Sequence, residues 1–146
     1  MAIKKVESKN FFKGGDANMN KDFCHLHVHS EFSLLDGLCK VDKIFEKVKS
    51  LNHMAISITD HGNMDSYVKA IQASVSNGIK YVPGCELYVV DDIEAYGAQK
   101  RGENKLSRKH LTLWAKNNAG VNAIFRLLGI ANKNFLKGRP TIQWSD

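Results

Sequence analysis

Short apolar runs alternate with amphipathic stretches along most of this chain of 146 residues. The apolar runs have the length and the content of Val, Ile, Leu and Tyr that are typical of β-strands, and they cover residues 23–28, 55–59, 81–90 and 111–115. The second run is almost wholly apolar, as expected of a strand that is covered on both faces. Pro83-Gly84 interrupts the third run.

Between these runs, apolar residues recur at intervals of three and four, which predicts helices over residues 41–51, 64–76 and 119–131. The faces expected to be buried consist of Val41, Ile44, Phe45, Val48 and Leu51 in the first helix, Tyr67, Val68, Ile71 and Val75 in the second, and Val121, Ile124, Phe125 and Leu128 in the third. Asn63 is placed to cap the start of the second helix, and Gly78 lies just past its end.

The resulting order, β-α-β-α-β-loop-β-α, predicts parallel strands joined by right-handed crossovers and therefore an α/β fold. Residues 1–22 are mostly charged and polar, and we expect them to form a loosely ordered lead-in to a single domain over residues 23–146. The densest basic stretch, residues 100–109, has no periodicity. It is predicted to be an exposed loop that is solvated in preference to contacting phosphate.

The composition, with 43% apolar and 25% charged residues, is typical of a soluble globular protein. No apolar run approaches the roughly 20 residues that span a bilayer, and the N-terminus lacks the features of a secretory signal. Cys24, Cys39 and Cys85 form no C-x-x-C pair, which suits a reducing cytoplasm, and each is predicted to be a small buried side chain. The net charge of +6 favours polyanionic partners, nucleic acid first.

Three histidines, His25, His27 and His29, are the strongest indication of chemistry in the sequence. Side chains alternate along a strand, so the three imidazoles should share one face. A lone histidine would favour a structural role. Two neutral imidazoles at positions i and i+2 can instead converge on one metal ion. The three together favour a metal site.

Two acidic positions extend this signal. Asp60 and His61 follow a buried apolar run, at the strand end where ligands collect in α/β proteins. Asp60 is interpreted as a direct ligand, as a residue that orients a neighbouring imidazole, or as a turn residue, and the sequence leaves these alternatives open. Glu86 lies within an apolar run, where it would be costly to bury without a partner. A metal ion or an arginine would supply that partner.

Four segments resemble successive motifs of the PHP (polymerase and histidinol phosphatase) domain of bacterial DNA polymerase III alpha subunits: HLHVHSEFSLLDG at 25–37, ITDHGNM at 58–64, PGCELYV at 83–89 and HLTLWAKN at 110–117. The FSLLDG and GCE sequences resemble the polymerase branch more than the histidinol phosphatases. The resemblance implies a partial, distorted barrel of seven β/α units, of which about four are present. It also implies up to three divalent transition metal ions, Zn, Mn or Fe, at the strand ends.

Carried over residue by residue, the resemblance implies six metal ligands, which are His27, His29, Asp36, His61, Glu86 and His110. It leaves His25 as an interior neighbour of this set. Asp60 is left as a residue that orients a ligand without contacting the metal. His110 fits least well, because it opens a β run instead of following one. A mixed imidazole and carboxylate set suits Zn, Mn or Fe better than Ca, and such a site supports phosphoester hydrolysis. The resemblance implies that this is a phosphoesterase or 3′→5′ exonuclease activity. No residue is assigned as catalytic.

The resemblance further implies three ligands late in the barrel, and residues 111–146 contain no histidine, cysteine or glutamate to supply them. We therefore expect a fragment, a split gene product completed by a second chain, or a trimmed relative, without polymerase activity of its own. The expected partners are the remainder of the polymerase or that second chain, DNA and other replisome subunits. The alternative is a non-catalytic structural or docking module of such a polymerase.

Overall fold

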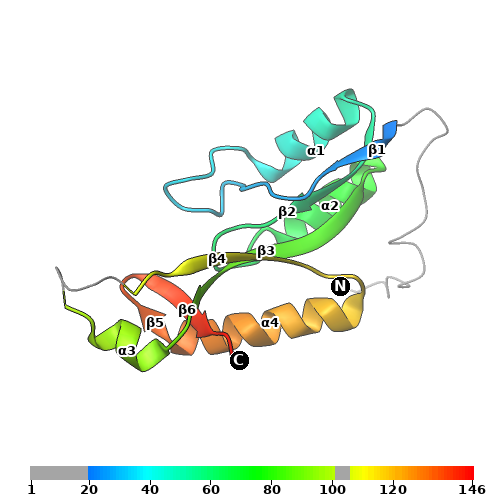
Figure 1. Ribbon diagram of the computed structural model, residues 1–146. Coiled ribbons are helices and arrows are strands. Elements are labelled where there is room, and N and C mark those ends of the chain that lie inside the picture. Colours follow the sequence, from blue (N-terminus) through cyan, green and yellow to red (C-terminus); the bar gives the residue numbers. More distant parts are fainter. Residues whose placement is uncertain (1–19, 101–105) are drawn as a thin grey trace, which may run out of the picture.

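A computed structural model of the chain describes residues 20–100 and 106–146. In this part of the chain, strands and helices alternate for most of its length (Figure 1). In chain order the elements are β1 (Asn20–His25), α1 (Val41–Ser50), β2 (His53–Ile58), α2 (Tyr67–Asn77), β3 (Lys80–Val90), α3 (Ile93–Ala98), β4 (Lys109–Trp114), α4 (Asn118–Lys133), β5 (Phe135–Leu136) and β6 (Arg139–Gln143).

The long strand β3 organises the sheet. It pairs in parallel with β2, which pairs in parallel with β1, and it also pairs in parallel with β6. The described strands form one open sheet in the order β1-β2-β3-β6-β5, with β4 attached to β3. The predicted α/β class is confirmed, and the open sheet agrees with a partial barrel.

The expectation that all strands would be parallel is wrong for β4, which runs antiparallel to β3. A parallel return would need a helix that crosses over the sheet. The helix between these strands, α3, is only six residues long and contacts β6 instead. The chain therefore re-enters along the edge of β3 in the opposite direction. This reversal matters for the site described below.

The hydrophobic core consists of two clusters that β3 joins. In the first, α1 and α2 pack against β2 and the start of β3 through buried side chains such as Phe45, Ile58 and Ile79. In the second, α4 packs against the later part of β3 and against β6 through side chains such as Leu87 and Leu128. Figure 1 shows α1 and α4 on opposite sides of the molecule, with β3 passing between them. Each such fully buried side chain stabilises the fold by roughly 1.5–3 kcal/mol.

The helix α1 matches its prediction to within one residue, whereas α2 begins three residues later than predicted. Tyr67 and Ile71 of its predicted face pack against the core, but the other two residues do not. Val68 and Val75 are 63% and 74% exposed, and the buried residues of α2 are Ala70 and Ala73. Both alanines belong to the same cluster as the buried face of α1, so small side chains allow the two helices to approach closely. Gly78 ends α2 in the left-handed conformation, with φ of 67°, as its position predicted.

The predicted third helix is confirmed as α4 and is extended at both ends, but Phe125 is exposed there instead of buried. Leu51 at the end of α1 is likewise exposed. The strand β3 continues through Pro83, which lies where the pairing with β2 ends and the pairing with β4 begins. The short elements α3, β5 and β6 were not predicted, because none carries a clear apolar period.

The predicted lead-in over residues 1–22 falls mostly outside the described residues, and residues 20–22 belong to β1. Half of the predicted basic loop, residues 101–105, also lies outside them, and Lys109 at its end belongs to β4. Residues 26–40, between β1 and α1, are called the irregular segment below. Among the cysteines, Cys85 is buried as expected, whereas Cys39 is exposed because it lies on this segment. None of the described helices combines the length and the apolar character needed to cross a membrane.

Candidate metal centre

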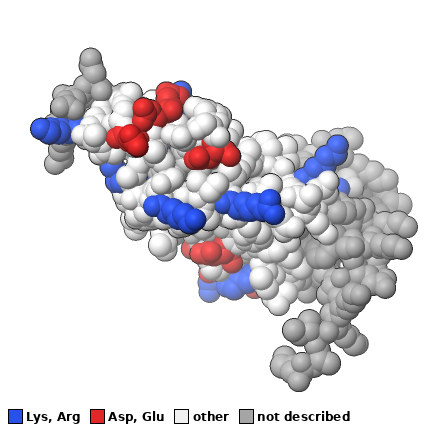
Figure 2. Space-filling model, turned by 90° about the horizontal axis from the view of Figure 1, so that it is seen from below, with Lys and Arg blue, Asp and Glu red and all other residues white. Residues whose placement is uncertain are grey.

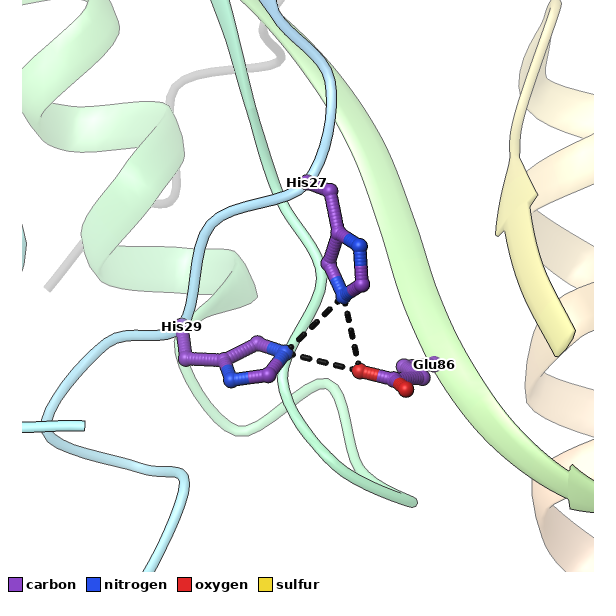
Figure 3. Close-up of side chains that lie close together, drawn as sticks. All are labelled: His27, His29 and Glu86. Carbon is purple, nitrogen blue, oxygen red and sulfur yellow. Dashed lines mark hydrogen bonds and ion pairs between the residues drawn. The ribbon is translucent and has the colours of Figure 1, made fainter. Parts of the chain in front are cut away.

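The segment that follows β1 brings two histidines toward β3. β1 ends at His25, so His27 and His29 lie just beyond the strand and not within it, which corrects the prediction of a strand up to residue 28. The backbone still runs beside the end of β2, because Val28 and Thr59 exchange hydrogen bonds of 2.8 Å and 3.2 Å. The side chains of His27 and His29 both point toward Glu86 on β3 (Figure 3).

His25 does not join them, which corrects its assignment as an interior neighbour. Its ring is exposed and lies edge-on to Phe23, with ring centroids 4.7 Å apart, and 5.6 Å from the ring of His53. The alternation of side chains ends with the strand, so His25 turns toward the surface of β1 and β2. It is therefore a histidine outside the cluster that can serve as a control.

Glu86 is the common partner of the clustered imidazoles. Its Oε2 lies 2.8 Å from Nε2 of His27 and 2.7 Å from Nε2 of His29, and these two nitrogens are 3.1 Å apart. Its other oxygen, Oε1, is hydrogen-bonded to Nδ1 of His110. The residue is only 3% exposed. Its carboxylate oxygens are therefore shielded from water and contact imidazole nitrogens instead.

Asp36 and His61 complete the cluster on the side of the irregular segment. Asp36 is hydrogen-bonded to Nδ1 of His29, and its Oδ2 lies 3.1 Å from Nε2 of His61. The other nitrogen of His61 lies 3.4 Å from Oε2 of Glu86. Three overlapping groups in the described part of the chain can hold a metal ion, and these are His27-His29-Glu86, His29-Asp36-His61 and His61-Glu86-His110.

The position of His110 at the start of a strand is explained by the direction of β4. Because β4 is antiparallel to β3, its first residues lie beside the carboxyl end of β3, where His110 pairs with Tyr88. A residue that opens β4 is thus brought to the same edge of the sheet as the residues that follow β1 and β2. All six residues that the resemblance implied as ligands lie together in the structure.

Asp60 supports the cluster through the backbone of the irregular segment. Its buried carboxylate accepts hydrogen bonds from the N–H of Ser30 at 2.7 Å and from the hydroxyl groups of Ser30 and Ser33 at 2.8 to 2.9 Å. Serines, and not an imidazole, are therefore its partners. Ser33 in turn accepts a hydrogen bond of 3.2 Å from the backbone N–H of His61. Asp60 fixes the segment that carries His29 and Asp36.

Asn63 takes part in the same arrangement and does not cap α2. Its side-chain amide donates hydrogen bonds to the carbonyl oxygens of Phe32 and His61, at 3.1 Å and 3.0 Å, and its oxygen accepts from the N–H of Asp65. The residue before α2 is Ser66, whose side chain makes no capping hydrogen bond. Asn63 therefore ties the irregular segment to the turn after β2.

Hydrogen bonding sets the charge of the two carboxylates. Burial alone would raise the pKa of Glu86, but hydrogen bonds from His27, His110 and His29 outweigh it and lower that pKa to about 2. The hydrogen bond from His29 lowers the pKa of Asp36. Burial lowers the pKa of His61, which favours its neutral form. Ionised carboxylates and neutral imidazoles are the forms that bind metal ions.

The donor set fits a divalent transition metal. Imidazole nitrogens and carboxylate oxygens are the ligands that zinc, manganese and iron share. Nδ1 of His61 is buried without a hydrogen-bond partner in the described structure, although it faces Glu86. Buried polar atoms normally have a partner, so this nitrogen has a ligand position to fill. An open cleft of roughly 520 Å³ gives solvent access to the cluster and is lined by His27, His29, Asp36, Gly37, Leu38 and Cys39.

Sequence analysis missed three residues that lie against the cluster, which are Tyr88, Arg108 and Arg139. The ring of Tyr88 stacks on His61, and both arginines lie over that ring. Tyr88 and Arg108 are each two positions from a predicted ligand, Glu86 and His110, so the period of a strand could have indicated them. Nothing local indicated Arg139, which reaches the cluster through the pairing of β6 with β3.

Comparison with known proteins agrees with this geometry. The sequence profile of the PHP domain matches residues 25–146. The chain is 35% identical to DNA polymerase III subunit alpha of Aquifex aeolicus over 86% of this chain and 11% of that protein. It is 36% identical to the subunit of the same name from Treponema pallidum over 80% of this chain and 10% of that protein. The chain thus spans about a tenth of the length of these relatives.

Two solved structures share the fold. An amidohydrolase from Chromobacterium violaceum, solved with bound sulfate and no metal, superposes with a TM-score of 0.53 at 20% identity, over 75% of this chain and 33% of that one. A candidate metal-dependent phosphoesterase from Bifidobacterium adolescentis superposes with a TM-score of 0.50 at 19% identity, over 75% of this chain and 34% of that one. At these identities the likeness concerns the fold alone.

Proposed function

This chain belongs to the PHP domain family, and from that premise we propose that it contributes a metal-dependent phosphoesterase site that acts on nucleic-acid ends during DNA replication. The observation that carries the proposal is the convergence of six metal-competent side chains from four separate segments, with the buried carboxylate of Glu86 among them. Four imidazoles placed this close together would repel one another when protonated. Packing of the core does not require this arrangement, whereas a metal ion does.

The residues that would hold the metal are those of the three overlapping groups. When bound, a divalent transition metal would polarise phosphate oxygens and lower the pKa of water. The chain's own residues contribute position and charge. Glu86 stays ionised and holds His27 and His29 with their Nε2 atoms turned inward. The half-exposed side chain of His27 borders the cleft, where a phosphate group can approach.

We further propose that this chain works with the remainder of a DNA polymerase III alpha chain, or with a second chain that supplies it, and with DNA and other replisome subunits. The support is the open sheet and the identity to relatives about ten times longer. In this proposal residues 23–146 are the N-terminal portion of a PHP domain, and the added polypeptide supplies the three late ligands. Zinc, manganese and iron are the candidate metals.

Metal content measured by elemental mass spectrometry tests the proposal. We expect at least one ion per wild-type chain and its loss in a His27→Ala/His61→Ala variant. A His25→Ala/His53→Ala variant removes two histidines outside the cluster and should keep the metal. The proposal would be contradicted if the wild-type chain bound no metal alone and still bound none after addition of the polypeptide that supplies the three late ligands. Hydrolysis of an oligonucleotide from its 3′ end by the completed, metal-loaded assembly then tests the activity.

A non-catalytic docking module is the second candidate, and one observation favours it. Leu34, Leu35 and Leu38, on the irregular segment beside the cleft, are largely or fully exposed. Large exposed apolar side chains that lie this close in the sequence are typical of interaction sites. In this case His61→Ala should weaken folding or assembly, and the completed assembly should show no hydrolysis for that substitution to remove.

A further inference from the structure

One face of the sheet continues beyond the metal centre to a pair of arginines. Tyr88 follows Glu86 by two positions on β3, so both side chains lie on the same face. Tyr88 pairs with His110 of β4 and with Thr141 of β6. Arg108 and Arg139 each precede one of these partners by two positions. Two neighbouring segments therefore bring an arginine to the ring of Tyr88.

The ring of Tyr88 connects the arginines to the candidate ligands. Cζ of Arg108 lies 4.6 Å from the ring centroid and Cζ of Arg139 lies 5.6 Å from it. The ring of His61 stacks on Tyr88 with centroids 5.7 Å apart and an interplanar angle of 8°, and His110 meets it edge-on at 4.9 Å. Both guanidinium groups and two of the candidate ligands therefore contact the same aromatic ring.

The two guanidinium groups have no anionic partner in the described structure. Neither side chain makes an ion pair or a hydrogen bond among the described residues, and Nη1 of Arg108 is buried without a partner. The carboxylate of Asp91, which follows β3, is paired with Lys109 at 3.2 Å. Contact with Tyr88 orients a guanidinium group but leaves its N–H groups unused. Two positive groups beside one ring, with no anion to bind among the described residues, form a site for an anion.

The planar fork of arginine matches the oxygens of phosphate. We propose that Arg108 and Arg139 form a phosphate-binding subsite, which takes a backbone phosphate of a nucleic-acid strand whose end lies at the metal centre. This inference rests on the proposed function, because it assigns the substrate's second phosphate to the same site. It also explains why a basic pair lies beside a cluster that already holds four imidazoles.

The face on the side of α4 offers basic residues for a control. Figure 2 shows this face, where the described basic side chains lie in several separate places. The side of β3 that packs on α4 carries Leu87 and Val89, whereas Glu86 and Tyr88 point to the other side. Arg126 and Lys133, both exposed on α4, therefore provide a control pair on the opposite side of the sheet.

Binding of a fluorescein-labelled octathymidylate, measured by fluorescence anisotropy at several salt concentrations, tests the inference. The variant is Arg108→Gln/Arg139→Gln and the matched control is Arg126→Gln/Lys133→Gln. We expect the variant to bind roughly tenfold or more weakly, with a salt slope of log affinity reduced by about 0.7 for each phosphate that the arginines no longer neutralise. The control should change affinity less, and both proteins should keep the metal content of the wild type.

Equal affinities of the variant and the control would overturn the inference. If the variant loses metal or folded structure, seen by circular dichroism, Arg108→Lys/Arg139→Lys takes its place, because it keeps both charges without the planar fork. Wild-type affinity in that protein would overturn the contact of the arginine forks with phosphate. The failure of the metal centre is a separate outcome. In that case no metal binds to the wild type, while the octathymidylate still depends on the two arginines in metal-free protein.

Discussion

At the scale of single residues, Glu86 has the largest share in the candidate site, because it contacts four imidazoles and belongs to two of the three groups. We expect Glu86→Gln to lower zinc affinity by about 100-fold or more, since residues that only support a ligand already contribute 10- to 100-fold. Competition with a chelating dye measures the affinity. Glu46→Gln, which removes an exposed carboxylate of α1, should leave it unchanged.

Glu86 should also give the metal-free protein a defined response to acid. Its pKa is lowered from the ordinary 4.5 to about 2 in the folded state, so it binds its proton more weakly folded than unfolded. It therefore stabilises the fold above pH 4.5, and this contribution is lost as the pH falls toward 2. The free energy of unfolding of the wild type, relative to Glu86→Gln, should fall by about 3 kcal/mol across this window. A difference that stays constant with pH would contradict the assignment.

The sequence indicates the candidate metal ligands better than it indicates the residues that surround them. His27, His29 and Glu86 stand out because imidazoles and a carboxylate are unusual in apolar β runs. Arg108 and Arg139 do not stand out, because they acquire a role only through the register of β4 and β6 on β3. A register between distant strands leaves no local period in the sequence.

At the scale of elements, the irregular segment between β1 and α1 depends on one glycine. A Cβ atom on Gly37 would lie 1.9 Å from the carbonyl oxygen of Ser30, which Asp60 holds in place. Gly37→Ala should therefore displace the segment and Asp36 with it. We expect a loss of roughly 1–3 kcal/mol in the free energy of unfolding, and a zinc affinity at least tenfold weaker.

Gly129 in α4 is the matched control for that substitution. A Cβ atom there meets nothing within 4 Å, and the residue lies inside a helix. Gly129→Ala should stabilise the protein by about 1 kcal/mol through helix propensity and leave zinc affinity unchanged. Urea denaturation of both variants gives the two energies. If Gly37→Ala keeps both stability and affinity, the segment is not held as described.

The elements that sequence analysis predicted well are those with a local signal. α1 and α4 have long apolar faces, and Gly78 ends α2 as expected. The buried face of α2 was predicted only in part, because contact with α1 selects Ala70 and Ala73 over the larger Val68 and Val75. The direction of β4 was predicted wrongly, since it depends on how the chain returns after α3.

At the scale of the whole molecule, the candidate site lies where the two hydrophobic clusters meet. His27, His29, Asp36 and His61 come from the segments after β1 and β2, which belong with the first cluster, whereas His110 comes from β4, beside the second. Glu86 lies on β3, the strand that joins both. A bound metal ion would therefore connect the two halves of the core.

This connection predicts how metal binding changes stability. Zinc at about 1,000 times its dissociation constant should raise the free energy of unfolding by about 4 kcal/mol. Because the ligands span both clusters, hydrogen exchange should slow in β2 and also in β4 when zinc is added to the wild type. His25→Ala should behave like the wild type, and Glu86→Gln should lose the protection of both strands. Protection confined to β2 would instead mean that His110 and Glu86 do not hold the metal, and that the two clusters respond to it separately.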